Sequence, residues 1–437
     1  RFHADRAGAS LTQHLSLSDR LSLASTAYVS RFARDWWRQS SNSAQRPNDA
    51  ADPACGGMAN LTTTCGNEGR LRRYIVGGIE TRATVRAARG ELDFGARVHA
   101  ESQDRLQKNG DSPTARDGRL VEHNERGVVA ASGFVQQRFT AGPVAITPGL
   151  RVENVHFERR NQLAGARGRA SFTQVIPGIG VAASLGSRAL LFGGVHRGFA
   201  PPRVEDAVTD SGGTVDLDAE LSWNTEVGIR TTMGEHVRAD ITLFRMDYQN
   251  QIVPASLAGG VGATLTNGGE TLHQGLELGL RGEAGSPVRD GDRLYARAAY
   301  TFVPIAEFTG VRFSGVSGFS TVRVTGNRLP YAPEHLATIT GGYRAGDRAD
   351  VFAEMVFVSS QFGDDLNTVA GTADGQRGLI PSATTWNAGA NLTLLPGRAT
   401  AFAAVYNVAD RLSIADRSRG IVPSPPRRMQ MGVRVTF

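Results

Sequence analysis

The sequence has no apolar run long enough for a transmembrane helix. Its apolar fraction is 40%, and no stretch approaches the roughly 18 apolar residues that such a helix needs. Its start, RFHADRAGAS, has neither an initiator Met nor the apolar core of a signal peptide, which says little if the chain does not begin where its gene does. A helical membrane anchor is therefore not expected, and a membrane span built from strands stays open.

Lysine is nearly absent. Lys108 is the only Lys among 48 basic residues, and 42 acidic residues leave a net charge of +6. So strong a preference for Arg favours a GC-rich genome over a functional cause. The basic residues are spread along the chain and mixed with acids, whereas nucleic-acid binding is typical of a basic stripe. Nucleic acid is therefore excluded as a partner.

Cysteine occurs only twice, at Cys55 and Cys65, in the stretch ADPACGGMANLTTTC. No His or further Cys stands nearby at a spacing typical of zinc sites. We favour a disulfide that closes a Gly/Thr/Asn-rich loop in an oxidising compartment, with two free thiols as the alternative. The nine His are scattered along the chain, so neither a bound metal nor a cofactor is predicted.

Catalytic sequence motifs are missing as well. No G-x-S-x-G, P-loop or H-E-x-x-H occurs, and the Gly-rich stretch GGVGATL near Gly260 lacks the following helix that phosphate binding requires. The sequence therefore predicts no enzyme. An outer-membrane lipase or protease, with Ser, His and Asp brought together only in space, is the alternative.

What the sequence has in abundance is strict alternation of apolar and polar residues. In the final stretch, RRMQMGVRVTF, every second residue from Met429 to Phe437 is apolar. A period of two predicts a β-strand with one apolar face. The stretch HQGLELGLR likewise places Leu276, Leu278 and Leu280 on one face, and DRLYARAAYTF, WNAGANLTL and VRADITL follow the same pattern. No amphipathic helix is predicted.

The alternating segments predict 17 strands, at roughly 1–15, 20–37, 71–87, 91–105, 126–140, 143–158, 170–185, 188–198, 220–232, 236–249, 271–284, 292–304, 332–344, 349–362, 383–394, 399–408 and 426–437. Short turns such as LGS and PGR alternate with long loops rich in Gly, Asp, Asn, Ser and Pro, near 38–70, 106–125, 159–169, 199–219, 250–270, 305–331, 363–382 and 409–425.

Long antiparallel strands with short turns at one end are typical of outer-membrane β-barrels. Such a barrel turns its apolar face to lipid and its polar face to a wet interior, and closure removes the unpaired strand edges. A soluble propeller or large sandwich is the alternative. A propeller would show a sequence repeat of about 40 residues, and sandwich strands are mostly about 5–6 residues long. The predicted fold class is therefore all-β, a transmembrane antiparallel up-and-down barrel.

The predicted number of strands is odd, whereas bacterial single-chain barrels have an even number and both ends on the periplasmic side. The last predicted strand follows a long loop and so descends to the periplasm. Counting back places the first residue on the extracellular side. We therefore expect that N-terminal strands are missing from this chain.

Five stretches together resemble TonB-dependent outer-membrane receptors. LLFGGVHRGFAPPRVEDAV is similar to the family's Arg-Gly-Phe-Pro segment, and LSWNTEVGIR to its Asn-x-Glu-x-Gly strand. TNGGETLHQGLELGLRG is similar to its Asn-Gly…Gly-x-Glu stretch, and GNRLPYAPEHLATI to its Gly-Asn…Leu-Pro…Ala-Pro-x-His stretch. VYNVADR and the terminal Phe437 resemble its Asn-Leu-x-Asp motif and its C-terminal signal for barrel insertion. The resemblance covers essentially the whole chain, in the family's order.

The resemblance implies a barrel of 22 strands. Residues 1–437 would then form one barrel domain that lacks the five leading strands and the N-terminal plug domain. It also implies a place in the bacterial outer membrane, in contact with lipid, and uptake of a ferric chelate. A TonB-type energy-transducing protein would act through the missing N-terminal region.

Within the family, FARDWWRQ followed by a long loop and RRYIVGGIETR is most similar to the ferric-citrate branch. Receptors for other ferric siderophores, for cobalamin or for plant- and polysaccharide-derived nutrients are alternatives. A passive or structural barrel, such as a porin or an adhesin, is an alternative of another class.

Trp36, Trp37, Arg38 and Gln39 stand where a strand enters the long loop 38–70, and we predict ligand contact there. Ferric citrate is anionic, and Arg binds carboxylates through bidentate, charge-assisted hydrogen bonds. The alternative for the two Trp is packing in the loop or in the aromatic girdle at the membrane interface.

Overall fold

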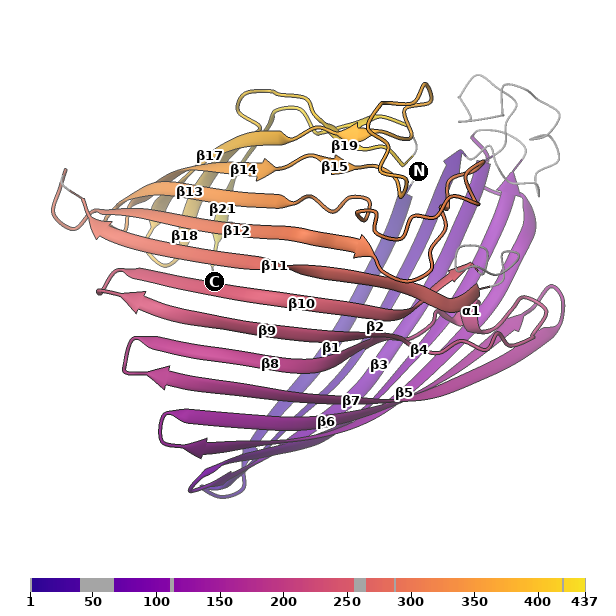
Figure 1. The fold of residues 1–437 in the computed structure, drawn as a ribbon, viewed down its shortest axis with the longest axis horizontal. Helices are drawn as coiled ribbons and strands as arrows, with labels where there is room; N and C mark the ends of the chain where they lie inside the picture. Colours follow the sequence, from indigo (N-terminus) through magenta and orange to yellow (C-terminus); the bar gives the residue numbers. More distant parts are fainter. Residues whose placement is uncertain are drawn as a thin grey trace. The chain divides into compact units, whose positions relative to one another are not determined.

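The computed structural model describes residues 2–39, 67–110, 114–254, 265–286, 288–418 and 420–436. These residues form a main sheet of 17 strands, and strands that follow one another along the sheet pair in antiparallel fashion (Figure 1). Within the described ranges, no helix has the length and apolar character needed to cross a membrane. The predicted all-β antiparallel fold and its 17 strands are confirmed. Cys55, Cys65 and Phe437 lie outside the described residues, so the disulfide and the insertion signal stay predictions.

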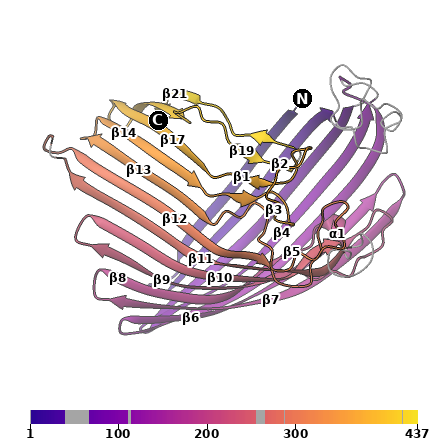
Figure 2. The same ribbon diagram turned by 45° about the horizontal axis from the view of Figure 1, so that its top comes forward.

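The chain divides into two compact units. Unit 1 comprises residues 1–139, 147–177 and 199–219. It contains the whole or the greater part of seven strands: β1 (Phe2–Ser16), β2 (Leu21–Gln39), β3 (Asn67–Ala87), β4 (Gly90–Gly110), β5 (Arg119–Ala141), β6 (Val144–Asn161) and β7 (Ala166–Leu185). Figure 2 shows β1 to β5 side by side in chain order. A single helical turn that the sequence did not predict, α1 (Val204–Ala207), belongs to the same unit.

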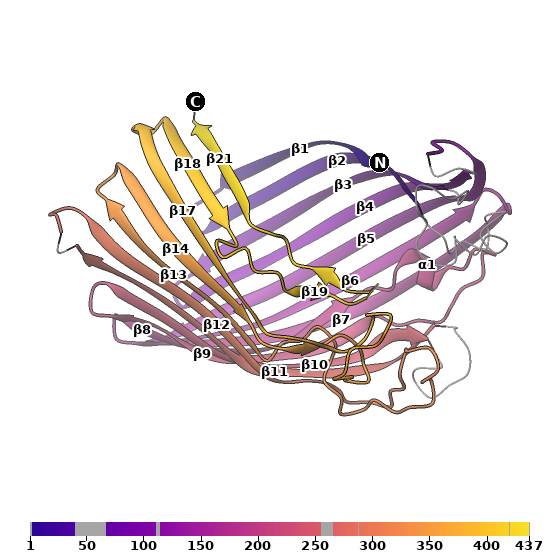
Figure 3. The ribbon, with the colours of Figure 1, turned by 90° about the horizontal axis from the view of Figure 1, so that it is seen from above.

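Unit 2 comprises residues 140–146, 178–198 and 220–437. Its strands of the main sheet are most of β8 (Ala189–Ala200), then β9 (Glu220–Met233), β10 (Val237–Pro254), β11 (Leu265–Gly285), β12 (Arg293–Phe308), β13 (His335–Ala345), β14 (Ala349–Val358), β17 (Ala383–Leu395), β18 (Ala399–Tyr406) and β21 (Arg428–Val435). Figure 3 shows β12, β13, β14, β17, β18 and β21 in succession. Two of the longer connections each contain a small two-stranded sheet: β15 (Gln361–Phe362) with β16 (Leu379–Ile380), and β19 (Ile414–Asp416) with β20 (Val422–Pro423).

The sheet has one apolar and one polar face. Side chains directly opposite each other on antiparallel strands share a face, and Ala27, Ile79, Val98 and Ala131 stand opposite one another across β2 to β5. Ile79 is 54% exposed and Val98 49% exposed. Adjacent positions put charged residues on the other face, where Glu80 pairs with Arg97. An exposed apolar face of this extent is what a strand sheet in contact with lipid requires.

Short turns close every second connection. Gly186 and Gly397, in two of them, have φ of +67° and +69° with open space where a Cβ would stand. This left-handed conformation reverses the chain and suits glycine best.

The predicted long loop near 159–169 is wrong. β6 ends at Asn161 and β7 begins at Ala166, so the connection is a turn of residues 162–165. Asn161 Oδ1 accepts hydrogen bonds from the amides of Leu163 and Ala164 at 3.0 and 3.3 Å, and Gly165 completes the turn with φ of +66°. The polar composition of this segment indicated a loop, but an Asx turn joins two strands that are polar on both faces at this end.

The two faces predict opposite responses to a buried charge. Leu278 lies on the apolar face opposite Ile241, four residues into β10, while the next residue, Gly279, faces Asp240 on the polar side. We expect Leu278→Arg to lower the free energy of unfolding in lipid vesicles by about 2–4 kcal/mol, because a guanidinium near the bilayer midplane is costly. Gly279→Arg, with Asp240 opposite, is the matched control and should cost less. Urea titration of protein folded in vesicles measures both, and the reverse order would show that the faces are exchanged.

Candidate functional site

Arginine side chains gather on the polar face of unit 1, toward the ends of the strands that carry the longer connections. The register places Arg34, Arg72 and Arg105 opposite one another on β2, β3 and β4. On the same face, Arg38 and Arg70 lie nearer to the longer connections than this row, and Arg126 lies on its other side. We call these residues the arginine cluster: Arg34, Arg38, Arg70, Arg72, Arg105, Arg126 and Arg159.

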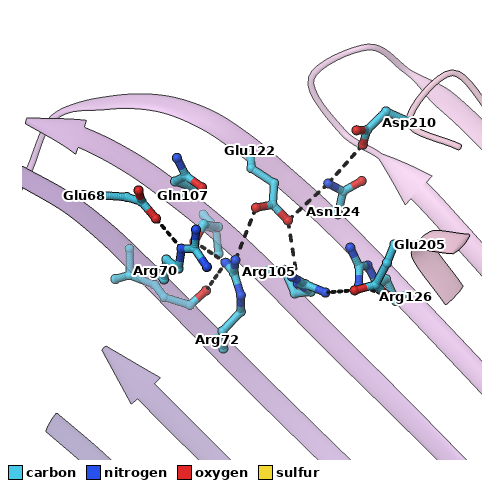
Figure 4. Close-up of polar contacts among 12 residues, drawn as sticks. Glu68, Arg70, Arg72, Arg105, Gln107, Glu122, Asn124, Arg126, Glu205 and Asp210 are labelled. Carbon is cyan, nitrogen blue, oxygen red and sulfur yellow. Dashed lines mark hydrogen bonds and ion pairs between the residues drawn. The ribbon is translucent and has the colours of Figure 1, made fainter. Parts of the chain in front are cut away.

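Four carboxylates lie among these guanidinium groups (Figure 4). Glu122 on β5 contacts both Arg72, at 3.2 Å between Nη2 and Oε2, and Arg105, at 3.6 Å between Nε and Oε1. Glu68 at the start of β3 pairs with Arg70, and with Arg38 at 3.4 Å. Each of these carboxylates is thus shared by two guanidinium groups.

The other two carboxylates come from the connection between β8 and β9. We call this connection, residues 201–219, which contains α1, the strap. Glu205 in the strap receives Arg105 Nη1 at 3.2 Å and also pairs with Arg126. Asp210 pairs with Arg159, whose Nε donates to Asn124 Oδ1 at 3.1 Å.

Apolar packing holds the strap against the sheet. Val204, Ala207 and Val208 are buried in one cluster with Val155 and Phe157 of β6. These β6 residues lie on the polar face, where an apolar patch interrupts the charges. Because Val208 is fully buried, the strap is a fixed part of unit 1, and its two carboxylates hold fixed positions beside the arginine cluster.

Burial also acts on a third carboxyl of the strap, that of Asp206. Desolvation raises the pKa of Asp206, and the neighbouring charge of Glu205 raises this pKa further. Glu205, and not Asp206, is the carboxylate that pairs with Arg105 and Arg126.

The cluster has a surplus of positive charge. Its seven Arg face four carboxylates, Glu68, Glu122, Glu205 and Asp210. The buried Nε atoms of Arg34 and Arg38 have no hydrogen-bond partner among the described residues. Unfilled guanidinium donors in partly dehydrated surroundings attract an anion, and they favour one with oxygen acceptors.

The structure brings two of the four predicted ligand residues into this cluster. Trp36 lies on the polar face, with Arg38 Cζ 5.0 Å and Arg34 Cζ 5.8 Å from its ring centroid. Cations over an aromatic face are held in place by its quadrupole. Trp36 therefore holds two guanidinium groups of the arginine cluster, those of Arg34 and Arg38.

The other two predicted residues lie differently. Trp37 is 7% exposed and its ring covers Gly69, where an added Cβ would lie 2.6 Å from the ring. Gln39 is placed by its backbone, opposite Asn67. Arg34, Arg70 and Arg72 were not among the predicted ligand residues. The alternation of Arg70, Arg72 and Tyr74 in GRLRRYIV was the sequence signal for the last two.

In the part of the chain that the structure describes, no three His, Cys, Asp or Glu side chains lie close enough together to hold a metal ion. What the arginine cluster offers chemically is hydrogen bonds and charge for a bound anion.

The chain matches a protein-family model. The model for "TonB dependent receptor-like, beta-barrel" matches residues 1–408 of this chain. The match covers both units and ends before the last strand of the main sheet.

Several solved structures of similar fold are larger than this chain. The ferric citrate transporter FecA in its unliganded form has 21% identity and a TM-score of 0.77, over 98% of this chain and 61% of that one. The siderophore receptor PiuA from Acinetobacter baumannii has 16% identity and a TM-score of 0.73, over 99% and 64%. The ferric-catecholate import receptor Fiu from E. coli K12 has 16% identity and a TM-score of 0.71, over 100% and 64%. This chain thus spans about three fifths of the length of these proteins.

The ion pair between Arg126 and Glu205 predicts how the strap responds when it is broken. Arg126→Gln leaves the strap without a charge-assisted bond worth about 1.5–3 kcal/mol. We expect the amide of Val208, which donates to Val204 O at 2.9 Å, to exchange its hydrogen about tenfold faster or more. Arg203→Gln is the control, because its ion pair with Asp206 is weak. The Arg203 side chain is 79% exposed, and its Nε lies 4.0 Å from Asp206 Oδ2, too far for a hydrogen bond. Equal protection of Val208 in both variants would mean that apolar packing alone holds the strap.

Proposed function

The chain belongs to the TonB-dependent receptor β-barrel family, and on this premise we propose that it serves in the energised uptake of an anionic ferric chelate. Proteins of this family are outer-membrane β-barrels, and the exposed apolar face of this sheet is suited to the lipid of that membrane. They are transporters and not enzymes. The proposal concerns what is transported and how it is bound.

The surplus of guanidinium groups on the polar face is the observation that carries the proposal. In a barrel the polar face lines the interior, so Arg34, Arg38 and Arg70 would face the path of the ligand. A ferric chelate of citrate presents several carboxylate oxygens and a net negative charge. Two-pronged hydrogen bonds from Arg suit those oxygens, and the low dielectric of a partly buried site strengthens them.

Trp36 is the second element of the proposed ligand site. Its ring holds the guanidinium groups of Arg34 and Arg38 by cation–π contact, which reduces the entropy lost when they bind a ligand. We propose that Trp36 and Arg38 contact the chelate. Trp37, packed over Gly69, and Gln39, at the last pair of β2 with β3, would position this strand end.

The same charges and the comparisons support two candidates for the chelate. Ferric citrate is our first candidate, and the similarity of fold to the ferric citrate transporter FecA supports it. Another anionic siderophore is the second candidate, supported by the similarity to the siderophore receptor PiuA and the ferric-catecholate receptor Fiu. A neutral nutrient would leave the surplus charge without a role.

Energised uptake also needs a gate and a source of work. We propose that residues 1–437 form the barrel domain of a longer receptor. A plug domain and a segment that contacts a TonB-type energy-transducing protein would then lie in the rest of that receptor. The greater length of the solved receptors of similar fold supports this arrangement.

The two arginines beside Trp36 provide the test. In protein produced from its full gene, Arg34→Gln with Arg38→Gln should weaken binding of ferric citrate about tenfold or more, because each lost charged hydrogen bond is worth about 1.5–3 kcal/mol. Trp fluorescence quenching measures the dissociation constant, and radiolabelled iron measures uptake by cells.

The matched control is Arg238→Gln, which removes an arginine from the polar face of unit 2, next to the short turn that precedes β10. It should leave both readouts unchanged. Unchanged affinity in the folded double variant would remove ferric citrate from this site. Binding without any energy-dependent uptake would argue for a passive barrel instead.

A further inference from the structure

A groove of about 1020 Å³ lies along unit 1, and most of its lining belongs to the apolar face. Small residues form its floor: Gly77 and Ala100 stand opposite each other on β3 and β4, and Ser102 and Gly127 on β4 and β5. An added Cβ at Gly127 would come no closer than 4.0 Å to any heavy atom outside its chain neighbours. The floor is therefore open and largely apolar.

Larger side chains form the edges of this floor. Val29 and Ile75 lie at one side and Val129 at the other. All three side chains are about half exposed, because the small residues of the floor cover little of their surface. A groove of this volume is comparable in size to small-molecule sites in proteins, and its apolar floor and edges suit a hydrocarbon chain.

One end of the groove is basic. Arg160 and Arg169 line it, and Arg167 stands next to Arg169 on the same face. Arg167 and Arg169 share one carboxylate, Glu158, with Arg169 Nε 3.1 Å from Oε2. Arg160 is exposed and makes no ion pair within the described ranges. Glu101 and Glu125 are the other acids that line the groove. Glu101 belongs to the polar face, where it pairs with His99, so on the apolar face three guanidinium groups meet two carboxylates, Glu125 and Glu158.

The basic end and the apolar floor are a fixed distance apart. His156, which lines the groove beside Val129, precedes Arg160 on β6 by four residues, about 13 Å along a strand. Arg160 is also next to the last residue of β6, toward the end of the strands that carries the longer connections. In an outer-membrane barrel that end faces outward, so the basic end lies at the level of the outer leaflet's headgroups.

We propose that this groove binds a phosphate-bearing lipid of the outer leaflet. One acyl chain lies over Gly77, Ala100 and Gly127, and the phosphate binds Arg160 and Arg169. Arg matches phosphate with two parallel hydrogen bonds, and the charge of the headgroup is complementary to the basic end. The apolar face meets lipid in any case, but a bilayer without specific contacts would leave Arg160 unpaired at an apolar boundary.

Glu158 has a defined part in this site. Its carboxylate occupies Arg167 and Arg169 in the absence of lipid, so it competes with the phosphate for the same guanidinium donors. Removing this carboxylate should therefore tighten lipid binding, a change of sign that general destabilisation of the sheet does not produce.

Native mass spectrometry of the full-length protein in mild detergent tests the proposal. The probes are lipid A with its phosphates and the same lipid A after dephosphorylation. We expect the unchanged protein to bind the phosphorylated form about tenfold more tightly. Arg160→Gln with Arg169→Gln should abolish this preference, and Glu158→Gln should increase it. Gly127→Leu, which fills the floor, should weaken binding of both forms.

Arg188→Gln is the matched control, because Arg188 is exposed in the turn between β7 and β8, outside the groove. Equal binding of the two lipids by the unchanged protein would overturn the proposal. So would an equal loss in Arg188→Gln and in the double variant, or a lipid-free dimer that covers the groove. If Gly127→Leu does not fold, the Arg and Glu variants still decide the outcome.

Discussion

The antiparallel hydrogen-bond ladder is the constraint on which the rest of this structure depends. A strand in lipid cannot leave its amides and carbonyls unpaired, so its neighbours must pair along its whole length. From Leu21 opposite Val85 to Gln39 opposite Asn67, β2 and β3 pair without a single shift of register. A slip of one residue would exchange the two faces of the sheet. The unbroken ladder thus assigns every side chain to lipid or to the wet interior.

Strand length then decides where charge can be placed. Crossing the bilayer takes about 9–11 residues, yet β3 and β4 have 21 residues each and β5 has 23. The additional residues extend past the apolar band, and there neither face needs to be apolar. The arginine cluster occupies the polar face of such extensions on β2 to β6, and the basic end of the groove occupies the opposite face of β6 and β7. The proposed anion site and the proposed lipid site therefore lie on opposite faces of the extended strand ends.

The strap shows how a connection becomes part of such a site. Its apolar residues pack against Val155 and Phe157 of β6. Its acids, Glu205 and Asp210, neutralise part of the arginine cluster. Without them the seven Arg would repel one another, and with a full set of carboxylates they would attract no ligand. The surplus charge that supports the proposed function is the excess of the seven Arg over the four carboxylates of the cluster.

The sequence by itself determined the strands and their faces. Period-two alternation indicated Leu276, Leu278 and Leu280 as one face because lipid selects apolar residues at every second position. It also placed Trp36 and Arg38 at a strand end. Where both faces are polar the alternation disappears, which is why the short connection between Asn161 and Ala166 was expected to be a long loop.

Only the tertiary structure decided which charges meet. Arg72 and Glu122, or Arg126 and Glu205, come from segments 50 and 79 residues apart. Their contact depends on the register between strands and on the docking of the strap. Apolar alternation sets which face a residue takes, but it does not say which residue of the next strand stands opposite. That choice is made by the pairing of whole strands and by the turns that join them, and no short stretch of sequence contains it.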